Sequence, residues 1–120
     1  MRHLGYCKNP AALLRNAFGF CLSSRYEGVS LALIEAAALG VPCIATDCVA
    51  GPREVLADGR YGELVAVEDP TALGNAMARH LADPAPLLQR AQASFLDRDR
   101  LSMTSAHARF AQAIEELLRV

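Results

Sequence analysis

Two glutamates, Glu27 and Glu35, are the residues of this 120-residue chain whose spacing most strongly suggests chemistry. Glu35 is the only charged side chain between Glu27 and Asp47, and it lies in segment 31–39, which is otherwise apolar on every face of a helix. A helix that is apolar all round is typically buried, and a buried carboxylate is costly unless it has a partner. The neighbours of Glu35 three and four positions away are alanines and leucines, so the helix itself offers no ion pair. We therefore expect Glu35 to find its partner elsewhere.

The segment before this helix favours a ligand as that partner. A structural partner would be a backbone N–H, or an arginine such as Arg25 or Arg53. However, residues 27–30 lead into the N-terminus of the helix, where free N–H groups and the helix dipole favour an anion. Gly28 in this segment would let a ligand approach the backbone closely. These features predict that an anion binds at the start of the helix.

The distance along the helix indicates a nucleotide diphosphate as the anion. Glu35 lies five residues beyond Ser30, which is roughly 7–8 Å along the axis, about the span from a diphosphate to the ribose of the same nucleotide. A carboxylate that accepts from both ribose hydroxyls would satisfy Glu35. Glu27, on the other side of the helix start, would face whatever the diphosphate carries, and a sugar would suit it because its hydroxyls can donate to an acid.

Short apolar runs alternate with helical segments, which predicts an α/β fold: a parallel sheet with helices on both faces. Buried strands are predicted at residues 18–23, 43–46 and 63–67, and residues 3–6 resemble the clipped end of another strand, giving about four. Helices are predicted at residues 10–17, 30–39, from 51 to before 58, 70–82, after 84, and 102–118, the last of them amphipathic. Ligands bind outside the carboxyl ends of the strands in such sheets, so loops 5–9, 23–30 and 46–53 are the candidate site loops.

The composition limits the other classes of function. A net charge of −1 argues against binding nucleic acid or a membrane surface through charge alone. No apolar run is long enough to span a bilayer and the N-terminus has no signal-peptide pattern, so we expect a cytoplasmic protein. The cysteines and histidines are not spaced as a metal site. We expect the cysteines to be free thiols, with Cys21 and Cys43 in the core because they lie in apolar runs: Cys7, Cys21, Cys43 and Cys48. The histidines are expected at the surface: His3, His80 and His107.

The glutamate pair and its surroundings resemble the E-x7-E region of retaining glycosyltransferases with the GT-B fold, in the group-one or family-four class. The likeness covers residues 4–81 and rests on four segments in family order, with residues 3–6 fitting the preceding strand end: 23–36 (SSRYEGVSLALIEA), 39–47 (LGVPCIATD), 51–56 (GPREVL) and 58–65 (DGRYGELV). It implies that the chain is a partial, Rossmann-like, C-terminal donor-binding domain, with C-terminal helices in residues 84–120.

The resemblance also implies a role for each site residue. Glu35 would bind the ribose hydroxyls, and Glu27, as the catalytic residue, would contact the transferred sugar. The backbone N–H groups of Gly28, Val29, Ser30 and Leu31 would hold the diphosphate, and Tyr6 would lie near the base, unless it merely covers a loop. Arg53 is expected at the surface of its helix rather than as an anion ligand. The reaction would be sugar transfer with retention, helped by electrostatic stabilisation of the departing diphosphate, without a metal or cofactor.

The chain departs from the family pattern in two respects. It lacks the acceptor-binding domain, and it lacks the opening strand–helix pairs of the donor domain, with their glycine turn and Arg/Lys pair. We therefore expect a piece of a transferase that is inactive alone and that, in a full-length enzyme, lies in the cytoplasm or at the inner face of the membrane. Its donor would be a UDP-sugar and its acceptor a polysaccharide or lipopolysaccharide. The alternatives are a sugar epimerase with the GT-B fold, or a non-catalytic module that binds nucleotide sugar, a second copy or a partner protein through an exposed sheet edge.

Overall fold

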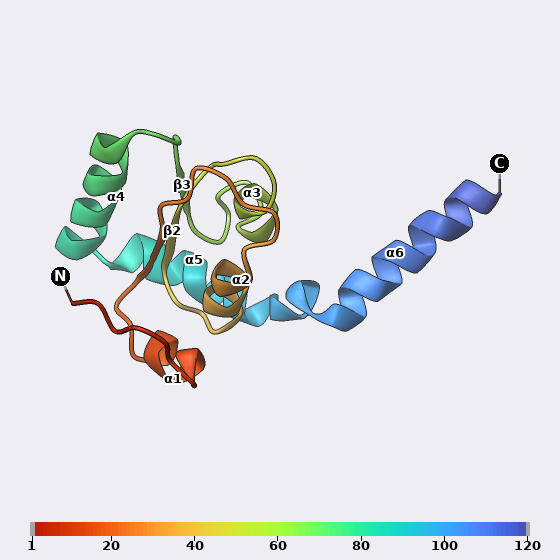
Figure 1. Ribbon diagram of the computed structural model, residues 1–120, viewed down its shortest axis with the longest axis horizontal. Helices are drawn as coiled ribbons and strands as arrows, with labels where there is room; N and C mark the ends of the chain where they lie inside the picture. The colour runs from red at the N-terminus through yellow and green to blue at the C-terminus, as the bar shows by residue number, and fades with distance from the viewer. Residues whose placement is uncertain (1, 120) are drawn as a thin grey trace.

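A parallel sheet of three strands forms the centre of the structure, a computed structural model that describes residues 2–119 (Figure 1). The strands lie in chain order: β1 (Phe20–Leu22), β2 (Cys43–Thr46) and β3 (Glu63–Val65). β2 pairs in parallel with both neighbours, with Ala45 opposite Leu22 on one side and Leu64 on the other. The predicted α/β fold with a parallel sheet is confirmed.

The sheet has three strands in the described residues instead of about four. β2 has its predicted bounds, whereas β1 and β3 are shorter than predicted, and residues 3–6 form no strand. A strand needs a neighbour to satisfy its backbone N–H and C=O groups, and the outer edge of β1 has no strand beside it in the described residues.

Helices occur at all the predicted places, with caps that the sequence indicates. The side chain of Asn9 accepts from the N–H of Ala12 at 3.2 Å, and that of Asp69 accepts from Ala72 at 2.8 Å. Both helices have proline in the first turn, where its missing N–H is no loss. The helices are α1 (Pro10–Arg15), α2 (Leu31–Ala38), α3 (Pro52–Val55), α4 (Pro70–Ala82), α5 (Ala85–Leu96), the 3-10 helix η1 (Arg98–Leu101) and α6 (Met103–Leu118).

Helices pack on both faces of the sheet, as predicted. Successive side chains of β2 point to opposite faces, so each face has apolar side chains for a helix to cover. Cys43 and Ala45 point to the face covered by α2, where they pack with Leu33, Ala36 and Ala37. On the other face Ile44 packs with residues of β3, α4 and α5: Val65, Ala76 and Leu87. Burial raises the pKa of the Cys43 thiol to about 12, so this cysteine stays protonated in the core.

The sequence-based assignments of His80 to the surface and of Cys21 to the core are wrong. His80, expected at the surface, is 6% exposed, because it follows Ala76 by one helical turn on the buried face of α4. Its Nε2 lies 3.0 Å from the carbonyl oxygen of Phe18, and its ring lies against the ring of that residue. Cys21, expected in the core, is exposed because β1 is an outer strand of the sheet.

The last helix, α6, projects from the rest of the molecule (Figure 1). It contains no buried residue, and the molecule extends 52 Å along its longest axis against 30 and 29 Å along the others. None of the helices in residues 2–119 has both the length and the apolar character that crossing a bilayer requires.

Two glycines give a matched test of the packing. A Cβ at Gly62 would lie 2.8 Å from the carbonyl oxygen of Cys43, whereas a Cβ at Gly74, in α4, would meet nothing within 4 Å. We expect Gly62→Ala to lower the free energy of unfolding by about 1–3 kcal/mol through overpacking. Gly74→Ala should raise it by about 0.5–1 kcal/mol through helix propensity. Urea denaturation of both variants measures this, and equal stabilities would contradict the packing beside β2.

Candidate functional site

Three loops meet at the carboxyl edge of the sheet, where ligands of parallel sheets bind. Residues 23–30 follow β1, residues 47–51 follow β2, and residues 66–69 follow β3. The side chains of Arg25 and Glu68 form an exposed ion pair at 3.4 Å between the first and third loops. The N–H of Asp47 donates to the carbonyl of Val65 at 2.7 Å, which joins the second loop to the end of β3.

A short chain of hydrogen bonds holds Glu27 in the first loop. The buried Thr46, at the end of β2, donates through Oγ1 to the carbonyl oxygen of Ser24 at 2.5 Å. Ser24 in turn donates through its own hydroxyl to Oε1 of Glu27 at 2.5 Å. Glu27 is partly buried, and its second carboxylate oxygen has no hydrogen bond within the described residues. The carboxylate is thus positioned by the sheet and retains acceptor capacity for a ligand.

The start of α2 has the free donors that the sequence predicts. Ser30 is the N-cap residue and is buried, but its side chain makes no capping hydrogen bond. The N–H of Leu31 donates to the carbonyl of Val29 at 3.1 Å, and within the described residues the N–H groups of Ala32 and Leu33 have no acceptor. Unsatisfied N–H groups at a helix start, together with the helix dipole, favour a bound anion.

Two glycines border the start of α2. A Cβ at Gly28 would meet nothing within 4 Å, so packing within the described residues does not require glycine there. A Cβ at Gly51 would lie 3.8 Å from both the Gly28 carbonyl oxygen and the Ser30 nitrogen, so the loop after β2 lies beside the start of α2. Gly51 and the preceding Ala50 both have positive φ, 105° and 60°. The sequence does not predict this positive φ at Ala50, although Ala50-Gly51-Pro52 is a turn-like signal.

Glu35 does not have the environment that its sequence predicts. It is exposed, because α2 buries one face only, through Leu33, Ala36 and Ala37, while Leu31 is 66% exposed. An apolar residue on every face of the helix therefore does not mean that every face is buried. The faces of α2 that are not buried carry small alanines and the uncovered Leu31.

The arginines considered as partners of Glu35 pair elsewhere. Arg25 pairs with Glu68, while Arg53 forms ion pairs with Asp47 and Asp58. Arg53 is exposed on α3, as expected, and its hydrogen bonds to the two aspartates raise the pKa of its guanidinium. A hollow of about 540 Å³ lies here, between α3 and the loop after β2. Because Arg53 is already paired with two carboxylates, it is a poor candidate for an anion ligand.

Tyr6 is not brought close to the start of α2. It is 90% exposed, and its segment, residues 2–9, runs past the side of the sheet where the strands begin, whereas loop 23–30 lies on the side where they end (Figure 1).

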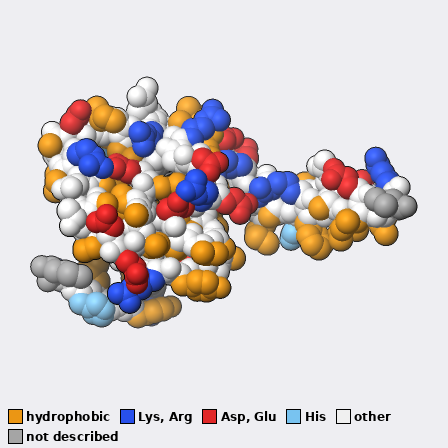
Figure 2. All heavy atoms as spheres, turned by 90° about the horizontal axis from the view of Figure 1, so that it is seen from above, with side chains coloured by type: hydrophobic (Ala, Val, Ile, Leu, Met, Phe, Trp, Pro, Cys, Tyr) orange, Lys and Arg blue, Asp and Glu red, His pale blue; other side chains and the backbone are white. Residues whose placement is uncertain are grey.

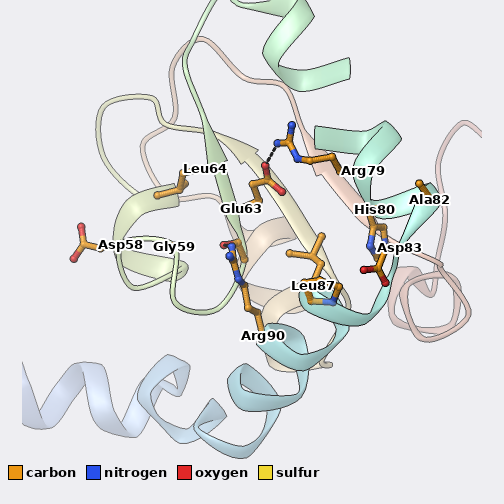
Figure 3. A pocket seen from close by; sticks show the side chains of 12 residues that line it. Asp58, Gly59, Glu63, Leu64, Arg79, His80, Ala82, Asp83, Leu87 and Arg90 are labelled. Atoms are coloured by element: carbon orange, nitrogen blue, oxygen red, sulfur yellow. Dashed lines mark hydrogen bonds and ion pairs between the residues drawn. The ribbon is translucent and has the colours of Figure 1, made fainter. Parts of the chain in front are cut away.

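Another hollow, of about 710 Å³, lies away from the predicted site, at the amino end of β3 (Figure 3). Its arginines are engaged: Arg79 pairs with Glu63, and Arg90 donates to the carbonyl of Gly62 at 3.1 Å. Because both arginines of this hollow are already engaged within the protein, it gives no reason to move the candidate site from the carboxyl edge.

Comparison with known proteins identifies the family. The sequence model of the family described as glycosyl transferases group 1 matches residues 1–83. The chain belongs to the group 1 glycosyltransferases. The matched region includes the whole sheet and all three site loops.

Individual relatives are similar over part of their length. The lipopolysaccharide 1,6-galactosyltransferase of Salmonella typhimurium is 41% identical over 51 residues, 42% of this chain and 14% of that protein. The MMP alpha-(1->4)-mannosyltransferase of Mycolicibacterium hassiacum is 40% identical over 77 residues, 64% of this chain and 19% of that protein. The glycogen synthase of Mycobacterium tuberculosis is 37% identical over 91 residues, 76% of this chain and 21% of that protein.

A solved structure supports the same assignment. The sucrose-phosphate synthase from Thermosynechococcus elongatus, which has the GT-B fold, superposes on 82% of this chain and 25% of its own length. The TM-score is 0.59 at 29% sequence identity. The fold predicted by the resemblance, part of a GT-B glycosyltransferase, is confirmed.

The hydrogen bonds of Thr46 generate a prediction about the loop that carries Glu27. Thr46→Val keeps the shape of the side chain but removes the donor to Ser24, so we expect a loss of about 1 kcal/mol in the free energy of unfolding. Amide hydrogen exchange of residues 24–30 should become faster. In the control variant Ser24→Ala, the carbonyl that accepts from Thr46 remains, and the exchange should change less. Unchanged exchange in Thr46→Val would show that this hydrogen bond does not hold the loop.

Proposed function

We propose that this chain binds the nucleotide-sugar donor of a retaining glycosyl transfer at the carboxyl edge of its sheet. The observation that supports this proposal most directly is at the start of α2. The N–H groups of Ala32 and Leu33 are free there, and the loop that leads into this helix start holds Glu27, whose carboxylate is positioned by hydrogen bonds to the sheet. Membership of the group 1 glycosyltransferases supports a sugar donor as the ligand of this arrangement.

The diphosphate is assigned to the start of α2. The N–H groups of Gly28, Val29 and Ser30 have no backbone acceptor in the described residues and join those of the first helical turn as donors. Leu31, the fourth residue predicted to contribute, would first have to release the carbonyl of Val29. The open space beside Gly28 would allow the phosphate oxygens close to the backbone.

Glu27 and Glu35 are assigned to the two ends of the donor. Glu27, oriented by Ser24, would accept hydrogen bonds from hydroxyls of the transferred sugar. Glu35 lies on α2 beyond the diphosphate and would accept from the ribose hydroxyls, which its exposure leaves room for. The contact of Tyr6 with the base stays a prediction and would require segment 2–9 to move towards the carboxyl edge.

The chemistry follows from the position of these groups. When the bond between the sugar carbon and the diphosphate oxygen breaks, the electron pair leaves with the diphosphate, and its charge grows beside the N–H groups and dipole of α2. Donors fixed in advance stabilise that charge more than they stabilise the intact donor, which lowers the barrier. The acceptor hydroxyl would then form its bond to the same face of the sugar, with retention, and its proton would pass to the departing diphosphate oxygen.

The donor is proposed to be a UDP-sugar and the acceptor a growing polysaccharide or lipopolysaccharide. This proposal draws on relatives named as lipopolysaccharide galactosyltransferases from Salmonella typhimurium and Escherichia coli. The chain spans 14% and 27% of those two proteins, so we propose donor binding, and not turnover, as the activity of this chain alone. We place this activity in the cytoplasm, or at the inner face of the membrane in a full-length enzyme.

Calorimetric titration with UDP and UDP-sugars tests the proposal and separates the two glutamates. Glu35→Gln should weaken UDP and UDP-sugar binding equally, by about three- to tenfold, because an exposed charged acceptor for the ribose is lost. Glu27→Gln should leave UDP binding unchanged and weaken UDP-sugar binding by about three- to tenfold. Glu115→Gln, on the distant α6, is the matched control and should bind like the unmodified chain.

The outcomes are distinct. Absence of heat at millimolar UDP and UDP-sugar would exclude a donor site in this chain. If Glu27→Gln weakened UDP and UDP-sugar binding to the same extent, Glu27 would contact the nucleotide, and its assignment to the sugar would be wrong.

A further inference from the structure

Ser30, the N-cap residue of α2, carries a buried hydroxyl that does not cap its own helix. The residue is 4% exposed, and within the described residues its side chain makes no capping hydrogen bond and the N–H groups of Ala32 and Leu33 have no acceptor. A serine at this position usually accepts from one of those two N–H groups, which stabilises the helix. A buried polar group without a partner costs free energy. Three donors without an acceptor thus lie together at the start of α2.

The backbone at Ser30 explains why the serine does not cap. Its φ and ψ of −84° and 81° form an inverse γ-turn, in which the N–H of Leu31 donates to the carbonyl of Val29 at 3.1 Å. Ser102, at the start of α6, has a ψ of 153° and does cap, because its hydroxyl accepts from the N–H of Ser105 at 3.1 Å. The turn before α2 therefore rotates the Ser30 hydroxyl away from the position in which a serine caps.

Longer side chains do cap from a similar backbone conformation. Asn9 and Asp69 have ψ values of 76° and 84°, close to that of Ser30. Each accepts from the N–H three positions onward, Asn9 from Ala12 at 3.2 Å and Asp69 from Ala72 at 2.8 Å. At this ψ the side-chain oxygen of Asn or Asp reaches the first helical turn, whereas the shorter serine does not. An oxygen supplied by a ligand could take that position at α2 and accept from the Ser30 hydroxyl as well.

The donors at the start of α2 favour an anion with several oxygens. N–H groups and the positive end of the helix dipole attract negative charge, and a phosphate can accept several hydrogen bonds at once. Basic side chains supply little of the attraction. Figure 2 shows Lys and Arg interspersed with Asp and Glu on the face in view. Arg25, in the loop before α2, and Arg53, on α3, are already paired with acids. Hydrogen-bond donors must therefore hold the anion.

The approach to Ser30 is open on the side of Gly28. A Cβ at Gly51 would lie 3.8 Å from the Ser30 nitrogen, so the backbone of the loop after β2 closes one side of the helix start. A Cβ at Gly28 would meet nothing within 4 Å. A ligand can thus reach the helix start past Gly28, in the loop that also carries Glu27.

We propose that the Ser30 hydroxyl donates a hydrogen bond to the diphosphate of the sugar donor, whose oxygen takes the role that the capping side chains have in α1 and α4. This inference rests on the proposed donor site and adds a side chain to its backbone donors. The same oxygen accepts from the N–H of Ala32 or Leu33. As the bond to the sugar breaks, negative charge grows on the diphosphate, and the hydrogen bond from Ser30 becomes stronger.

Amide NMR of the isotopically labelled chain tests the role of the hydroxyl. In the unmodified chain UDP should shift the amide signals of Ala32 and Leu33, whereas uridine, which has no phosphate, should not. Ser30→Ala should weaken UDP binding by about tenfold, because one hydrogen bond to a charged group is lost. Without UDP, amide hydrogen exchange of Ala32 and Leu33 should be the same in this variant as in the unmodified chain, because no cap is lost.

Ser30→Asp tests the choice between capping and binding. The longer side chain should cap α2 as Asp69 caps α4, which slows the exchange of the Leu33 amide. Its charge should weaken UDP binding by at least about thirtyfold. A loss of binding with a better protected helix is the opposite of what a damaged fold would give. Ser102→Ala is the matched control: it removes a real cap, so exchange of the Ser105 amide should become about fivefold faster while UDP binding stays unchanged.

The outcomes separate the hydroxyl from the donor site as a whole. Equal UDP affinity of the unmodified chain and Ser30→Ala overturns the inference and leaves the donor site standing. Uridine shifts at Ala32 and Leu33 like those of UDP would place the nucleoside, not a phosphate, at the helix start, which overturns it too. Faster exchange of Leu33 in Ser30→Ala without UDP would show that the serine caps its own helix. If the unmodified chain binds no UDP at millimolar concentration, the proposed function and this inference both fail.

Discussion

Parallel pairing of β2 with strands on both of its sides is the constraint on which the rest of the structure depends. All four residues of β2 are buried, and alternate ones support the core under α2 and the core under α4. Because the three strands run in the same direction, the loops that follow them must meet at one edge. The topology of the sheet alone thus brings these loops together at the place of the candidate site, whatever side chains they carry.

Thr46 connects this scaffold to the chemistry. It is the last residue of β2, and its hydroxyl fixes the backbone of the neighbouring loop, whose Ser24 then orients the carboxylate of Glu27. Glu27, which is proposed to contact the sugar, is therefore linked to the central strand by only two hydrogen bonds, those donated by Thr46 and Ser24. Functional carboxylates held in this way are positioned by the rigid part of the fold even though they lie in a loop.

The sequence was sufficient for features that depend on local signals. The caps at Asn9 and Asp69, the bounds of β2 and the position of the helix start beside Gly28 all follow from residue types a few positions apart. Features that depend on distant packing were not accessible. The burial of His80 requires Phe18, which lies 62 positions away, and the exposure of Glu35 depends on which faces of α2 other elements cover. The link from Thr46 to Ser24 spans 22 residues, so periodicity within either segment could not reveal it.

The exposure of α2 has a consequence for how strongly the candidate site can act. A carboxylate in water gains little net free energy from a hydrogen bond to a hydroxyl, because water competes for both groups, whereas the same bond in a medium of low permittivity is considerably stronger. Glu35, Leu31 and Val29 are all exposed. Any surface that came to lie over them would remove water from the apolar side chains and strengthen the proposed contact between Glu35 and the ribose in one step. Donor affinity and coverage of this face are therefore thermodynamically linked, so that each favours the other by the same factor.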